Sequence, residues 1–146
     1  MRRFIDALLG RSRPEPPKME RIFAMATAYI TLQTRLGLDP DTHAAITFRP
    51  VSSSYFSQAT EELNELLRLS TRDTGATFET HSDEYGFDWI IFEDPDFEDL
   101  VSTIHVVSTT LIEHGFGDRL LAALFRFTDK NGGQAYWFYN FKRGQF

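Results

Sequence analysis

Apolar side chains recur every three or four positions in three stretches of the chain, which is the pattern of amphipathic helices. The pattern predicts helices over residues 18–36, 53–71 and 95–114. Gly37 and Gly115 follow the first and the third, as expected of helix ends. Asp94 is expected to cap the third helix and Pro95 to open it, because aspartate accepts free amide hydrogens and proline suits the first helical position.

Apolar and polar positions alternate elsewhere, which is the pattern of strands that bury one face. The alternation predicts strands over residues 44–48, 77–81, 87–92, 120–128 and 135–142. Residues 83–86 are expected to form a turn between the second and the third strand, and these two strands should pair as a hairpin. The last two are separated by DKNGG, whose asparagine and glycines tolerate positive φ.

The predicted elements after residue 43 follow the order β-α-β-β-α-β-β. This order is that of a ferredoxin-like α+β fold with one extra strand. We therefore expect an antiparallel sheet with helices on one face, preceded by N-terminal helices, and the strand order stays open. Domain organisation is expected to be a basic amphipathic arm over residues 1–13, a proline-rich linker over 14–17 and a single α+β domain over 18–146.

The arm has four arginines and one acid between Arg2 and Arg13, with apolar residues at helical spacing. Such a segment suits a membrane surface, a groove on a partner, or the surface of its own domain, and the sequence leaves these open. The candidate contact residues of the arm are Arg2, Arg3, Phe4, Ile5, Leu8, Leu9 and Arg11.

The last predicted strand is aromatic on both faces. Trp137, Tyr139 and Phe141 alternate with Tyr136 and Phe138. Core packing is the main interpretation, because a strand that is apolar on both sides is usually covered. The alternative is an aromatic partner interface that uses Tyr136, Trp137 and Tyr139.

Charge argues against nucleic-acid binding, because the net charge of −6 opposes phosphate. Acids gather at the start of the third helix, where the helix dipole and capping favour them. The alternative is an acidic edge for a partner, made of Glu93, Asp94, Asp96, Glu98 and Asp99. The chain has no cysteine and no apolar run near the roughly 20 residues of a membrane span, so a cytoplasmic address is expected.

Candidate catalytic groups are sparse. The four histidines lack the paired helical spacing of zinc sites, and the acidic run lacks the glycine and glutamate of a calcium loop, so no metal or cofactor is expected. Ser52, Ser53 and Ser54 fit helix capping better than nucleophilic catalysis. The enzyme alternative is a hydrolase that pairs His81 or His105 with one of three carboxylates, Asp83, Glu84 or Asp88.

Five segments together resemble one known family: FIDALLGRSRP, MERIFAMATAYITLQTRLGL, EYGFDWIIFEDPDFEDLVSTIHVVS, GFGDRLLAALFRF and AYWFYNFKRG. The chain resembles the PspA-associated PspAB family over nearly its whole length, with EDPDFEDLV and YWFYNFKRG as the specific parts. The resemblance implies a cytoplasmic accessory of the phage-shock envelope-stress system built around the coiled-coil protein PspA, and a link to an HtpX-like membrane protease. It implies no catalytic residues, and relatives that continue past Phe146 would make this chain a shortened one.

Residues and resemblance together predict a non-enzymatic adaptor that binds a PspA-like protein. The alternatives are a peripheral membrane-surface binder, which would be membrane-associated in the cell, and a partner of an HtpX-like protease. A hydrolase, a secretion-chaperone-like binder and a homodimer complete the hypotheses.

Overall fold

The protein is described here by a computed structural model that covers residues 21–72 and 74–146. The predicted arm, 1–13, and linker, 14–17, lie outside the described residues. The elements in chain order are η1 (Ile22–Ala24), α2 (Met25–Thr31), η2 (Leu32–Leu36), β1 (Asp39–Phe48), α3 (Ser54–Thr71), β2 (Thr77–Ser82), β3 (Asp88–Glu93), α4 (Phe97–Glu113), η3 (Gly117–Arg119), β4 (Leu120–Thr128) and β5 (Gln134–Asn140).

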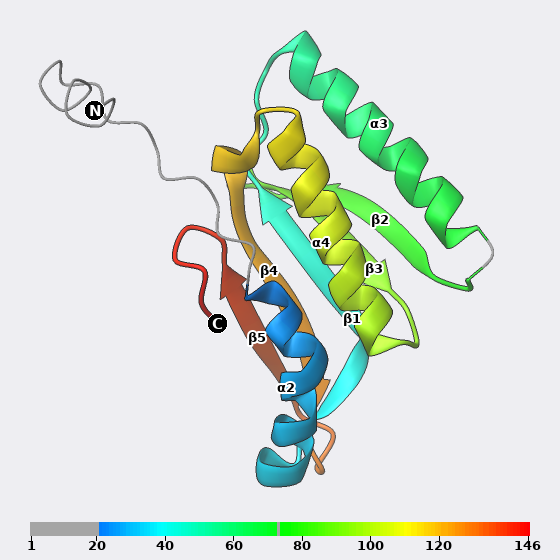
Figure 1. Cartoon of the computed structure of the whole chain (residues 1–146), viewed down its shortest axis with the longest axis vertical. Helices are drawn as coiled ribbons and strands as arrows, with labels where there is room; N and C mark the ends of the chain where they lie inside the picture. Colours follow the sequence, from blue (N-terminus) through cyan, green and yellow to red (C-terminus); the bar gives the residue numbers. More distant parts are fainter. Residues whose placement is uncertain (1–20, 73) are drawn as a thin grey trace, which may run out of the picture.

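The strands form one antiparallel five-stranded sheet in the order β2-β3-β1-β4-β5. β3 thus lies between β1 and β2, which are the two strands that α3 connects. The helices α2, α3 and α4 cover the same face of the sheet (Figure 1). α4 lies between the other two and packs on β1 and β4. The predicted α+β class and element order are confirmed.

The first helical segment is continuous from Ile22 to Leu36 but changes its winding along the way. It begins as a 3-10 turn, continues as the α-helix and ends as a π-helical turn. Gly37 ends it with a φ of 64°, a left-handed conformation that glycine adopts without steric cost. The predicted stop at Gly37 is confirmed.

Three predicted boundaries were wrong, and one of them is the end of β5, which lies at Asn140 rather than at residue 142. β1 begins five residues before the predicted residue 44, at Asp39, because the chain pairs with β4 again across a register shift between Pro40 and Ala44. α4 begins at Phe97, and its N-cap is Asp96, whose carboxylate accepts the amides of Glu98 and Asp99. Asp94 instead accepts the amide of Asp96, so it fixes the approach to the helix rather than capping it.

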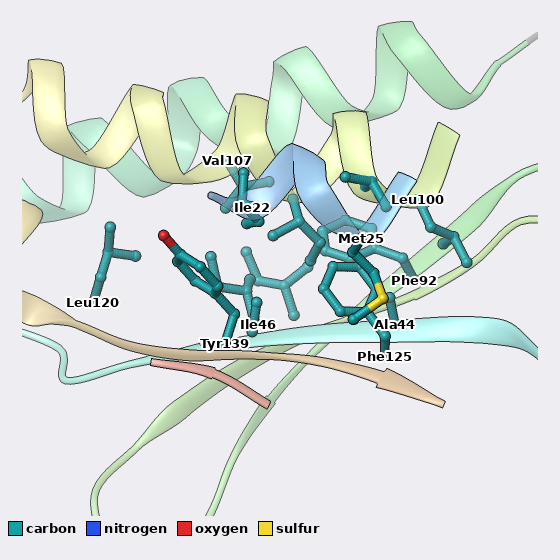
Figure 2. Close-up of a cluster of buried hydrophobic side chains, with 14 of the residues drawn as sticks. Ile22, Met25, Ala44, Ile46, Phe92, Leu100, Val107, Leu120, Phe125 and Tyr139 are labelled. Atoms are coloured by element: carbon teal, nitrogen blue, oxygen red, sulfur yellow. The ribbon is translucent and has the colours of Figure 1, made fainter. Parts of the chain in front are cut away.

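The core lies between the helices and the face of the sheet that they cover (Figure 2). Seven residues along one side of α4, from Phe97 to Leu111, are buried, as expected of an amphipathic helix. The ring of Phe97 packs 5.7 Å from Phe125 and 5.6 Å from Phe127 of β4. Ile22 and Tyr139 belong to the same cluster, so the first helical turn and the edge strand β5 share one core with α4.

We expect Phe125→Ala to lower the free energy of unfolding by about 3–5 kcal/mol, because Phe125 is fully buried and its loss leaves a cavity. Phe138→Ala is the matched control, since Phe138 lies on the neighbouring strand, is 54% exposed and faces away from the helices. It should cost about 1 kcal/mol or less. Urea unfolding measures both values, and equal losses would contradict the assignment of the two sheet faces.

Candidate binding surface

The face of the sheet away from the helices carries an apolar row across its centre. Strand register aligns Ile91 with Ala45, Ala45 with Leu124, and Leu124 with Phe138. Trp89 and Tyr136 lie on the same face, one on each side of the row, because residues two apart on a strand share a face. We call the six residues Ala45, Trp89, Ile91, Leu124, Tyr136 and Phe138 the open face.

The open face is partly solvent-exposed and slightly hollowed. Tyr136 is 49% exposed and Phe138 54% exposed. Between Trp89 and Tyr136 runs a shallow groove of about 240 Å³, whose walls include His43, Leu124 and Arg126. Large aromatic side chains gathered on one surface are typical of sites where proteins meet.

Arg126 and Asp41 form an ion pair at one end of the open face. The Arg126 Nε donates to Asp41 Oδ2 at 2.7 Å, and the Arg126 Nη2 donates to His43 Nδ1 at 2.8 Å. His43 Nδ1 is therefore an acceptor, because a guanidinium only donates. Partial burial alone would raise the pKa of Asp41, but hydrogen bonds from Arg126 and the Thr42 amide, with the charge of Arg126, lower it to about 2.

Trp89 is held at the other end of the open face by Asp83. The indole Nε1 donates to Asp83 Oδ2 at 2.8 Å, and the Asp83 Oδ1 accepts the amides of Tyr85 and Phe87 at 2.9 Å each. These contacts, led by the bond from Trp89, lower the pKa of Asp83. Asp83, a catalytic candidate from the sequence, thus serves to close the β2–β3 turn and fix the indole.

The five residues of the predicted acidic edge do not act as one surface. Asp94 is only 7% exposed, and Asp96 caps α4, so both have structural roles. Glu98 and Asp99 are exposed in the first turn of the helix, and Glu93 lies 3.7 Å from His43 Nε2 near the open face. Partial desolvation and the neighbouring carboxylates raise the pKa of Asp99, so the negative charge here is concentrated.

The three predicted aromatic contacts are also divided between two faces. Tyr136 lies on the open face, whereas Trp137 packs partly buried against the core and Tyr139 is completely buried. Tyr139 packs edge-to-face against Phe141 at 5.4 Å. An interface that includes Tyr139 was a wrong prediction, because alternation along β5 sends Trp137 and Tyr139 to the helix side.

The histidines and carboxylates named as catalytic candidates are not hydrogen-bonded to one another in the described contacts. His81 and Asp88 both line a cleft of about 360 Å³ between α3 and the β2–β3 hairpin, but the Asp88 carboxylate accepts from Ser82 at 2.7 Å. His105 packs its ring 4.5 Å from Phe23. Within residues 21–72 and 74–146, no group of three potential ligands is placed to hold a metal ion.

Two side chains lie at helix ends, and the first of them is a predicted cap. Ser53 caps α3, since its hydroxyl accepts the amide of Phe56 at 3.1 Å. His114 follows α4 directly, and its ring contacts the Thr110 carbonyl and the Glu62 carboxylate of α3, each at 2.8 Å. Because both partners only accept, both ring nitrogens donate, which is the arrangement of a protonated imidazole.

A family model described as PspA associated protein B, PspAB, matches residues 2–146. The chain belongs to the PspAB family. The match covers the arm as well as the domain, so Phe4, Ile5, Leu8 and Leu9 fall within it, although they lie outside the described residues. No curated protein and no solved structure matches the chain.

Sequence patterns did not predict most of the residues of the open face of this PspAB-family protein. Tyr136 was named, but Trp89, Ile91 and Leu124 were not, because each occupies an alternating strand whose other face is equally apolar. Arg126 was the available signal, since a charge between Phe125 and Phe127 marks the side of β4 that faces solvent. Nothing in the local sequence pairs Arg126 with Asp41, 85 positions away.

We expect Arg126→Met to raise the pKa of Asp41 from about 2 toward the ordinary value of about 3.9. The stabilisation from Asp41 is present above that ordinary value and is lost as the pH falls through the folded-state pKa. At neutral pH the variant should lose about 1 kcal/mol, because the paired side chains remain 24% and 19% exposed. Carboxyl NMR titration and urea unfolding test this, and Arg68→Met, at an exposed helix position, should change neither quantity.

We expect Glu62→Gln to lower the pKa of His114, which the Thr110 carbonyl and then Glu62 raise above its ordinary value. A raised pKa stabilises the fold fully below about pH 6.5, and this effect disappears as the pH rises through the folded-state pKa. The Tm difference between acid and alkaline solution should therefore shrink in Glu62→Gln. Glu65→Gln is the control, since Glu65 pairs with Arg68, and an equal change there would exclude the α3–α4 link as the cause.

Proposed function

We propose that this PspAB-family protein is a non-enzymatic accessory protein that binds a PspA-type protein through the open face. The family description supplies the association with PspA. The proposal rests on the apolar side of the sheet that the helices of the described residues leave uncovered, where Phe138 and Tyr136 are about half exposed. Burying these rings against a partner would remove apolar area from water, which is the main driving force of association.

Acidic groups near the open face favour a partner with lysine and arginine. Glu79 and Glu93 lie on the same side of the sheet as the open face. Glu98 and Asp99 are exposed at the start of α4, which packs on the opposite side. Charged groups at the edge of an interface change the rate and the selectivity of association more than its affinity. The arm, with Arg2, Arg3 and Arg11, stays a predicted second contact to a partner or a membrane.

The arrangement supports binding rather than catalysis. His81 and Asp88 line one cleft, but Ser82 binds the carboxylate, and Asp83 is engaged by Trp89. Across the described residues, no helix is both long enough and apolar enough to cross a bilayer.

We also propose that the fold is a ferredoxin-like one extended by β5. In the sheet, β3 lies between β1 and β2, and β1 lies between β3 and β4.

A titration of the purified protein with PspA at about 150 mM salt tests the proposal, because long-range surface charge is largely screened there. We expect saturable binding that Phe138→Ser weakens about tenfold or more. Leu69→Ser is the matched control, since Leu69 is 60% exposed on α3, away from the sheet, and should bind as the natural protein does.

Three outcomes would contradict parts of the proposal. Absence of binding would reject PspA as a direct partner. Equal affinity of Phe138→Ser and the natural protein would reject the open face. Unchanged affinity and association rate after Glu98→Lys with Asp99→Lys would exclude the start of α4 as a contact.

A further inference from the structure

We propose that the open face is the docking site of the chain's own N-terminal arm, residues 2–13. The arm would lie across the strands as an amphipathic helix, with Phe4, Ile5, Leu8 and Leu9 against the apolar row. One consequence rests on the proposed function: the arm and PspA would compete for the same surface. The docking itself does not depend on PspA.

Both surfaces are apolar, and the arm as a helix would be about as long as the sheet is wide. Twelve residues of α-helix are about 18 Å long, and five strands spaced about 4.8 Å apart span about 19 Å. The row from Ile91 through Leu124 to Phe138 crosses four of the five strands. The groove beside it, between Trp89 and Tyr136, offers room for a leucine or phenylalanine side chain.

The charges of the two surfaces are opposite. Residues 2–13 contain four arginines and one aspartate. On the open side of the sheet, Arg126 is already paired with Asp41, while Glu79, Glu93 and Asp83 contribute negative charge without a lysine or arginine bound to them in the described contacts. Because the linker joins the arm from the β5 side, Arg2 and Arg3 at the far end of the arm would lie over β3 and β2 and face these carboxylates.

The chain enters the described fold at a place from which the arm can reach this face. Arg21 precedes Ile22, which is buried on the helix side in the same cluster as Tyr139 of the edge strand β5 (Figure 2). Figure 1 shows this first turn beside β5. Residues 14–20 span about 22 Å when extended in the manner of proline-rich chain. Passing around β5 to the other side of the sheet requires about 20 Å, because packed layers lie about 10 Å apart.

A spin label on the arm of the full chain tests the docking. The protein has no cysteine, so Ser12→Cys gives a single labelling position. We expect strong paramagnetic broadening of the amides of Ile91, Leu124 and Phe138, and little at exposed α3 positions such as Leu69. Leu8→Asp with Leu9→Asp should abolish the broadening, whereas the control Asp6→Asn, off the apolar stripe of the arm, should keep it.

The outcomes separate the competing occupants. Absence of broadening at the open face would overturn the proposal. Isotope-labelled protein without a spin label, mixed with spin-labelled protein, should show no broadening. Broadening in that mixture would place the arm on a second copy and overturn docking within one chain.

Addition of PspA tests the competition separately. We expect bound PspA to remove the broadening. Broadening that persists while PspA is bound would overturn the shared surface but leave the docking intact. If PspA does not bind at all, the proposed function fails, and the experiment without PspA still decides the docking.

Discussion

The structure depends on the burial of one side of a five-stranded sheet beneath its helices. β1 occupies the centre and supplies Ala44, Ile46 and Phe48 to the core, and α4 lies over it with a continuous buried stripe. An antiparallel sheet can remain stable with one side facing water. Covering a single side is therefore sufficient for the fold, and the described helices leave the opposite side uncovered.

Because only one side of the sheet is covered by the described helices, the charged residues fall into two groups with different structural roles. Asp94 and Asp96 lead the chain into α4, and His114 follows the helix and connects it to Glu62 of α3. These groups stabilise the layer that buries the core. Arg126, Asp41 and Asp83 lie on the other side, where they fix the two ends of the open face. Charge at helix ends thus supports the helix layer, whereas charge around the open face holds Arg126 and Trp89 in place.

A protein with an uncovered apolar sheet face needs a way to prevent uncontrolled association. Acidic neighbours such as Glu79 and Glu93 repel like-charged surfaces and favour basic ones. The basic arm of this chain and a basic region on another protein satisfy the same requirement. In the arrangement proposed for this protein, the arm and the partner compete for one surface, and their relative affinities set how readily the partner binds.

Periodicity in the sequence by itself determined the α+β class, the order of the elements, the buried stripe of α4 and the stop at Gly37, because these depend on neighbours three or four positions apart. It placed the start of α4 two residues early, because Asp94 and Asp96 are both suitable caps and packing of Phe97 selects between them. Only the tertiary structure decided which side of each two-sided apolar strand the helices cover. That choice exposes Phe138, buries Tyr139 and brings Asp41 to Arg126, since the pairing of distant strands is fixed by the whole core rather than by any one segment.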